Sequence, residues 1–119
     1  MRKTSRKGWV RMLDKIVSDI VIKRDGLCVC CGSKRNLTAG HVFSRVAYST
    51  RWDLTNVYAQ CWPCNYRQKI KGDSYPIQNY FIEIWGRAKL DKLHKKYVTL
   101  VKYKNYQLEE LFNELKGVN

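Results

Sequence analysis

Apolar residues first recur at helical spacing near the start of the chain. Over residues 9–21 they return every three or four positions, and Asp25 and Gly26 provide an end signal. This pattern predicts an amphipathic helix. Two shorter apolar stretches follow, residues 37–43 and part of 52–60, and they predict two strands.

Four further helical segments are expected downstream: residues 65–71, 75–85, 89–100 and 106–116. Their end signals are Ser74 before the second segment, Gly86 after it, Asn105 before the last and Gly117 after it. The order predicts an α+β fold in one domain, residues 1–119. Its parts are a basic segment with a helix (1–25), a compact centre (26–73) and C-terminal helices (74–119).

Positive charge dominates the sequence. The 119 residues contain 23 Lys and Arg but only 10 Asp and Glu, which gives a net charge of +13. The basic residues are spread along the chain, a pattern that suits a folded face lying on phosphates and favours nucleic acid as partner. An anionic membrane surface is the weaker alternative, because no helix shows a clean basic amphipathic pattern. No run of 18 apolar residues predicts a membrane span.

Two Cys-x-x-Cys pairs, Cys28 with Cys31 and Cys61 with Cys64, are separated by 29 residues. Two such pairs can supply four thiolates to a tetrahedral zinc ion, and cytosolic cysteines stay reduced and available. A redox pair or buried free thiols is the alternative, although one pair would suffice for that. The fifth cysteine, Cys30, is read as a packed free thiol or as a replacement for Cys31 in a shifted register.

His41 and Asn56 stand between the two pairs, and Asn65 directly follows the second. In this setting the chain resembles the HNH (ββα-metal) nuclease superfamily, nearest the phage NinG (Rap) recombination nucleases. Its Cys-x-x-Cys-Asn ending is also similar to phage endonuclease VII, a junction resolvase. The resemblance covers about residues 26–86. It is carried by Cys28-x-x-Cys31-Gly32, Ala39-Gly40-His41-x-x-Ser44-Arg45, Arg51-x-Asp53-x-x-Asn56-Val57-x-Ala59-Gln60-Cys61-x-x-Cys64-Asn65 and Gly72.

The resemblance implies a ββα-metal core held together by a structural zinc ion. It also implies distinct roles for His41, Asn56 and Asn65. His41 on the first strand activates water, because a neutral imidazole can take a proton near pH 7. Asn56 braces the loop between the strands. Asn65 binds a catalytic Mg²⁺ or Mn²⁺ through its amide oxygen, and that ion neutralises charge on the scissile phosphate.

Basic residues around these positions are candidates for DNA contact. Arg45 is expected at the scissile phosphate, where it would stabilise the transition state. The nucleic-acid-binding set comprises Arg45, Arg51, Arg67, Lys69 and Lys71.

One position departs from the superfamily pattern. Gly40 stands where many HNH enzymes carry an Asp or His as a second metal ligand. The nearest oxygen donors in the sequence are Thr38, Asp53 and Asp73.

These features predict a metal-dependent DNA endonuclease in the cytoplasm of a phage-infected bacterium. Branched or recombination-intermediate DNA, such as D-loops or Holliday junctions, is the substrate that the resemblance implies. A non-catalytic zinc module that binds nucleic acid is the main alternative. An adaptor that binds proteins through exposed aromatics is disfavoured by the charge of +13. The apolar face of the first or last helix is a candidate homodimer surface.

Overall fold

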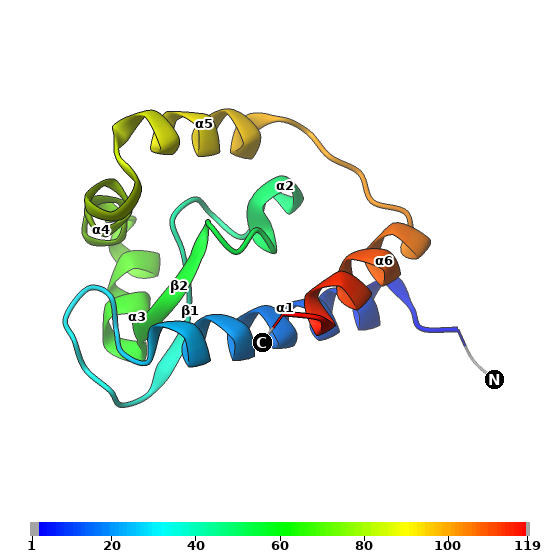
Figure 1. Ribbon diagram of the computed structural model, residues 1–119, viewed down its shortest axis with the longest axis horizontal. Helices are drawn as coiled ribbons and strands as arrows, with labels where there is room; N and C mark the ends of the chain where they lie inside the picture. Colours follow the sequence, from blue (N-terminus) through cyan, green and yellow to red (C-terminus); the bar gives the residue numbers. More distant parts are fainter. Residues whose placement is uncertain (1–2, 119) are drawn as a thin grey trace.

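The computed structural model describes residues 3–118, so Met1, Arg2 and Asn119 of the expected domain lie outside the described residues. Within this range the chain forms six helices and one two-stranded sheet, the predicted α+β class (Figure 1). No helix in the same range is both long and apolar enough to cross a membrane.

The first helix, α1, spans Arg6–Asp25 and begins earlier than the apolar pattern alone indicates. The Ser5 hydroxyl accepts a hydrogen bond from the Gly8 amide (3.0 Å), which satisfies one of the free N–H groups of the first turn. The helix ends at Gly26, whose φ of 71° is a left-handed conformation that glycine adopts without strain.

Strands β1 (Leu37–His41) and β2 (Val57–Cys61) pair antiparallel, with His41 opposite Val57. Strand β1 lies within its predicted stretch, and β2 extends one residue beyond the predicted 52–60. The loop between them contains α2, a single turn over Tyr48–Arg51 that the sequence pattern did not predict. It has no side-chain cap, so contacts from the rest of the domain must hold it in place.

Helix α3 (Trp62–Lys71) starts directly after β2, three residues earlier than predicted. Cys61 occupies its N-cap position and Pro63 lies in its first turn, where a missing N–H costs nothing. The second cysteine pair therefore spans the junction of strand and helix.

The last three helices are α4 (Tyr75–Trp85), α5 (Arg87–Val98) and α6 (Asn105–Lys116). Asn105 is not the cap of α6, as the sequence had suggested, but its first helical residue. Lys104 holds the cap position instead, and its backbone N–H donates to Gln107 Oε1 at 2.8 Å. Ser74 precedes α4 as expected, but its side chain makes no cap hydrogen bond.

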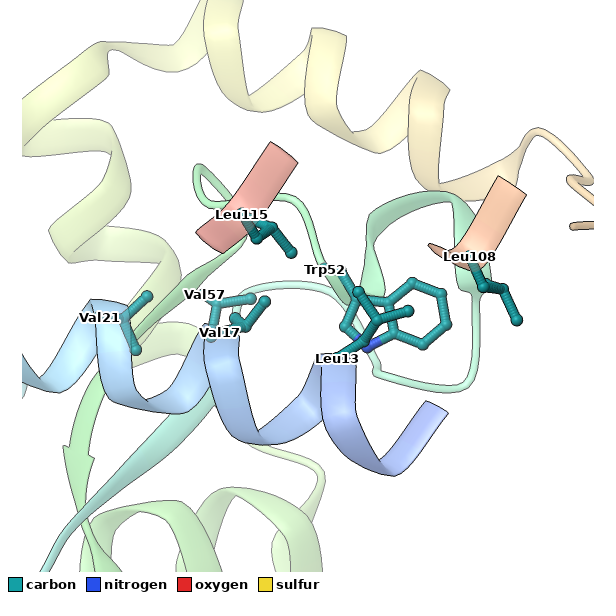
Figure 2. Packing of buried hydrophobic residues seen from close by; sticks show 7 residues of the cluster. All are labelled: Leu13, Val17, Val21, Trp52, Val57, Leu108 and Leu115. Atoms are coloured by element: carbon teal, nitrogen blue, oxygen red, sulfur yellow. The ribbon is translucent and has the colours of Figure 1, made fainter. Parts of the chain in front are cut away.

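Two apolar clusters lie on opposite faces of β2, because neighbouring residues of a strand point to opposite sides. Val57 belongs to the first cluster and Tyr58 to the second. In Figure 1, α6 returns to lie beside α1, and Figure 2 shows the cluster between them. Its buried members are Leu13, Val17, Val21, Trp52, Val57, Leu108 and Leu115. The second cluster packs under α4 and α5.

Candidate functional site

Four cysteine sulfurs form the clearest chemical feature of the molecule. The Sγ atoms of Cys28, Cys31, Cys61 and Cys64 all lie within 4.8 Å of one another. Cys31 and Cys61 are 3.6 Å apart, and a tetrahedral zinc with Zn–S bonds of about 2.3 Å separates its sulfurs by about 3.8 Å. This arrangement fits one zinc ion, whose ligands are the two pairs expected from the sequence.

The backbone around the first pair forms a tight knuckle. Gly32 has a φ of 80°, and its N–H donates to the Cys28 carbonyl at 2.8 Å. The Val29 N–H donates to the Ala59 carbonyl at 3.0 Å, which ties the knuckle to β2. An ion held here would join the knuckle, the end of β2 and the start of α3.

Cys28 of the cluster and the fifth cysteine, Cys30, differ in the direction of their pKa shifts. Burial opposes ionisation of Cys28, but hydrogen bonds from the backbone of Cys61, Cys31 and Cys30 lower its pKa to about 6. Cys30 is not part of the four-sulfur group. Burial raises its pKa, and its Sγ accepts a hydrogen bond from Gln60 Nε2 at 3.3 Å. Cys30 is therefore a packed thiol rather than a fifth ligand.

A cleft of about 910 Å³ opens beside the sheet and α3. His41 and Asn65 both line it, and so do Arg45 and Lys69. No Asp or Glu is among its lining residues in the described part of the chain. The fold thus places the expected base and the helix asparagine around one basic cavity.

The ring of His41 has a defined protonation pattern. Its Nε2 lies 3.0 Å from the backbone oxygen of Arg51. Because a carbonyl only accepts, Nε2 must carry the proton, and the neutral ring keeps its lone pair on Nδ1. Burial lowers the pKa of His41 below its ordinary 6.5, and the nearby charge of Arg45 acts in the same direction. The imidazole is therefore neutral at pH 7.

Arg51, expected to bind DNA, is turned inward instead. Its guanidinium donates to both oxygens of Asp14 on α1, at 2.9 and 2.7 Å, and its side chain is only 12% exposed. The Trp52 indole N–H donates to the same carboxylate at 2.8 Å. Asp14 and Arg51 together anchor α2 to α1, which holds the Arg51 carbonyl against His41. The geometry favours this positioning role over the expected phosphate contact.

Asn56 is fully buried and connects both ends of the loop between the strands. Its Oδ1 accepts from the Phe43 N–H at 2.9 Å, and its Nδ2 donates to the carbonyls of Phe43 and Thr50 at 3.1 and 3.0 Å. All its hydrogen bonds with the described residues go to backbone atoms, so Asn56 fixes the loop that follows His41.

Asn65 on α3 points back to β1. Its Nδ2 donates to Thr38 Oγ1 at 3.0 Å and to the Ala39 carbonyl at 3.2 Å. Thr38 gives its own hydroxyl proton to the Gln60 carbonyl, so it can only accept from Asn65. The amide orientation is thereby fixed, and Asn65 Oδ1 receives no hydrogen bond from the described residues.

The chain matches a family model along nearly its whole length. The model described as "Bacteriophage Lambda NinG protein" matches residues 2–118. The protein belongs to the NinG family. No curated protein and no solved structure matches it.

A neighbouring side chain explains why a glycine stands at position 40. A Cβ at Gly40 would lie 1.8 Å from Gln60 Oε1, so the glutamine occupies the space of any side chain there. Gln68 Nε2 donates to the His41 carbonyl at 2.9 Å, and its Oε1 accepts from Gln60 Nε2 at 3.0 Å. This relay fixes the Gln60 amide and leaves its buried Oε1 without a donor among the described residues. An acidic side chain cannot replace Gly40 without displacing Gln60.

We therefore expect Gly40→Ala to destabilise the domain by about 1–3 kcal/mol, the usual cost of overpacking a filled interior. Gln60→Ala should also destabilise it, because it leaves a cavity and unpairs Gln68. The double variant should lose less than the sum of the two, since it removes the clash. Urea denaturation of the zinc-loaded variants measures all three. Strictly additive losses would show that the two residues do not compete for this space.

Four of the expected DNA-binding cations, Arg45, Arg67, Lys69 and Lys71, are exposed. Arg45 and Lys69 line the cleft, whereas Arg67 lines a second, smaller pocket. Arg45 is 64% exposed and lies 3.8 Å from Asp14, a loose pair that leaves it free to contact phosphate. The two acids considered as metal ligands are not in the cleft lining.

Each of these acids is engaged elsewhere. Asp53 pairs with Lys96 at 2.6 Å, and Asp73 Oδ1 accepts from the Tyr75 N–H at 3.1 Å.

Asp14, Gln60 and Gln68 are the positioning residues that sequence reasoning missed. Of these three, only Gln60 could have been anticipated from a signal in the sequence. A glycine inside a strand often marks the close approach of another group, and Gly40 could have indicated an intruding side chain such as Gln60. Nothing in the sequence distinguishes Asp14 from other acids on a solvated helix.

Proposed function

We propose that this NinG-family protein is a DNA endonuclease of the HNH type. The order of β1, β2 and α3 corresponds to a ββα unit, with His41 at the end of the first strand and Asn65 on the helix. The observation that carries the proposal is His41, a neutral imidazole with its lone pair on Nδ1, in a cleft that Arg45 and Lys69 also line. A protein that only binds DNA has no need of this arrangement.

His41 acts as general base. Nδ1 takes a proton from a water molecule as its oxygen forms a bond to the scissile phosphorus. The P–O3′ bond breaks, and the leaving 3′ oxygen takes a proton from solvent, which gives 3′-hydroxyl and 5′-phosphate ends. The Arg51 carbonyl stabilises the resulting imidazolium through Nε2–H. Arg45 and Lys69 offset the charge that builds up on the phosphate.

A divalent ion fits this site only with help from the substrate. Asn65 Oδ1 is free to bind Mg²⁺ or Mn²⁺, but none of the described residues that line the cleft is a carboxylate. Such an ion would take its remaining ligands from water and from the DNA phosphate. When bound it would neutralise charge at the leaving oxygen.

The proposed substrate comes from the family likeness, and a second candidate function comes from the residues that line the cleft. Branched or recombination-intermediate DNA is the substrate class proposed from the family likeness, in an infected bacterium. A zinc-stabilised module that binds nucleic acid without cutting it is the second candidate. It is favoured because no Asp or Glu of residues 3–118 lines the cleft.

The cleavage assay decides between these two. Purified protein is incubated with end-labelled linear duplex and four-way junction DNA, in Mg²⁺, in Mn²⁺ and without divalent ion. We expect nicks with 5′-phosphate ends at the junction. Tight junction binding without a nick in any ion would leave the binding module as the function.

The affinity of the protein for DNA should fall steeply as the salt concentration rises. If Arg45, Arg67, Lys69 and Lys71 each neutralise one phosphate, log K should fall against log salt with a slope of about −3.6 on duplex DNA. Arg51→Gln should leave this slope unchanged, because its guanidinium is occupied by Asp14. Lys69→Gln should reduce it by about one. Titrations at several salt concentrations test both, and a slope near zero would exclude DNA as the partner.

A further inference from the structure

Helix α3 carries two aromatic side chains that the proposed chemistry does not use. Trp62 and Tyr66, one turn apart, are 56% and 49% exposed. Their rings stack with centroids 4.8 Å apart and planes only 13° from parallel. Both rings line the cleft that holds His41 and Asn65. A near-parallel stack of this kind has an outer face on which a third flat ring can lie.

Charge identifies the occupant of this face. Lys69 lies on the same helix and lines the same cleft, which has no acidic lining residue in the described part of the chain. A second copy of this protein would bring another charge of +13 to the face, and repulsion disfavours that partner. Aromatic rings combined with cations are the usual platform for single-stranded nucleic acid, where bases stack and phosphates pair with the cations.

We propose that Trp62 and Tyr66 form a stacking platform for an unpaired nucleobase next to the scissile phosphate. The bases of a continuous duplex are covered by their neighbours, so only a base outside the helical stack can reach the rings. The platform therefore selects DNA with unpaired bases, as found at flaps, junction branch points and single strands. This inference rests on the proposed function, because it deepens the substrate preference of the same cleft.

Binding without divalent ions tests the platform separately from cleavage. Fluorescence anisotropy is measured with a labelled single-stranded oligonucleotide and with a blunt duplex of equal length. Loss of one stacking contact should weaken single-strand binding by roughly 5- to 150-fold. We expect this loss for Trp62→Ala and Tyr66→Ala, with duplex affinity little changed, and partial rescue in Trp62→Phe.

Tyr106→Ala is the matched control, since Tyr106 is 57% exposed on α6 and is not in the cleft lining. It should bind both DNAs like the wild type. Circular dichroism and zinc content confirm that each variant is folded.

The outcomes separate the platform from the nuclease. If the two aromatic variants lose single-strand affinity but the wild type cuts no DNA, the platform stands and the nuclease proposal fails. If the wild type cuts DNA and both variants bind single strands normally, the platform is overturned. An equal loss on duplex overturns it as well. The platform is also overturned if the Trp62 and Tyr66 variants keep their single-strand affinity but change their oligomeric state. That result would identify the face as a protein interface.

Discussion

Cys61→Ser should release the metal and unfold the centre of the domain. Cys61 ends β2, occupies the N-cap position of α3 and lies in the four-sulfur cluster, so its loss loosens three segments together. Structural zinc supplies an apparent ~10–16 kcal/mol of binding free energy, whereas a whole domain is usually stable by only ~5–15 kcal/mol. We expect less than one zinc per chain and loss of cooperative unfolding. Elemental analysis and thermal unfolding by circular dichroism measure these effects.

Cys30→Ser is the matched control for this substitution. Cys30 lies outside the cluster, and its sulfur only accepts a hydrogen bond from Gln60, which a serine hydroxyl can also accept. The control should keep one zinc and fold normally. A strong chelator, which removes the zinc, should unfold the wild type as Cys61→Ser does. Intact folding in chelator, or equal zinc loss from both variants, would contradict a structural metal at this cluster.

The parts of the fold that the sequence predicted are those set by local signals. The amphipathic pattern and Gly26 locate α1 and its end, and the two Cys-x-x-Cys pairs identify the four sulfurs that meet. Such signals depend on spacing along the chain, which needs no knowledge of tertiary structure.

The missed features depend on contacts between distant residues. Helix α2 is a single uncapped turn, and Asn56 and Arg51 hold it through bonds to other parts of the fold. The inward turn of Arg51 needs Asp14, 37 residues away in sequence. The reason for Gly40 is likewise Gln60 on the other strand. The pairing of Arg51 with Asp14 leaves no pattern in the sequence around either partner. Gly40 in a strand indicates the close approach of another group, but it does not identify Gln60 as that group.

His41→Ala should remove most cleavage while the fold, zinc content and DNA affinity stay nearly unchanged. The imidazole is not a zinc ligand, and its one hydrogen bond in the described structure goes to the Arg51 carbonyl. Its proposed task is to take a proton from water, a contribution typically worth ~10²–10⁴ in rate. The measurement is single-turnover cleavage of a four-way junction at saturating protein.

His94→Ala is the control of the same residue type. The His94 ring packs on Phe43 at a centroid distance of 5.2 Å and is not in the cleft lining. Its loss should leave the cleavage rate close to that of the wild type. Equal rates for wild type and His41→Ala would remove His41 as the base without removing the nuclease activity.

The pH dependence of cleavage gives an independent check on His41. The base works only when neutral, and burial lowers its pKa below the ordinary 6.5. Protonation therefore becomes dominant only when the pH falls below that lowered value. The acidic limb of the rate profile should accordingly have its midpoint below pH 6.5, with a flat rate at pH 7 and above. The residual cleavage of His41→Ala should lack this limb. A wild-type midpoint above pH 6.5 would mean that a group other than the buried imidazole titrates in the reaction.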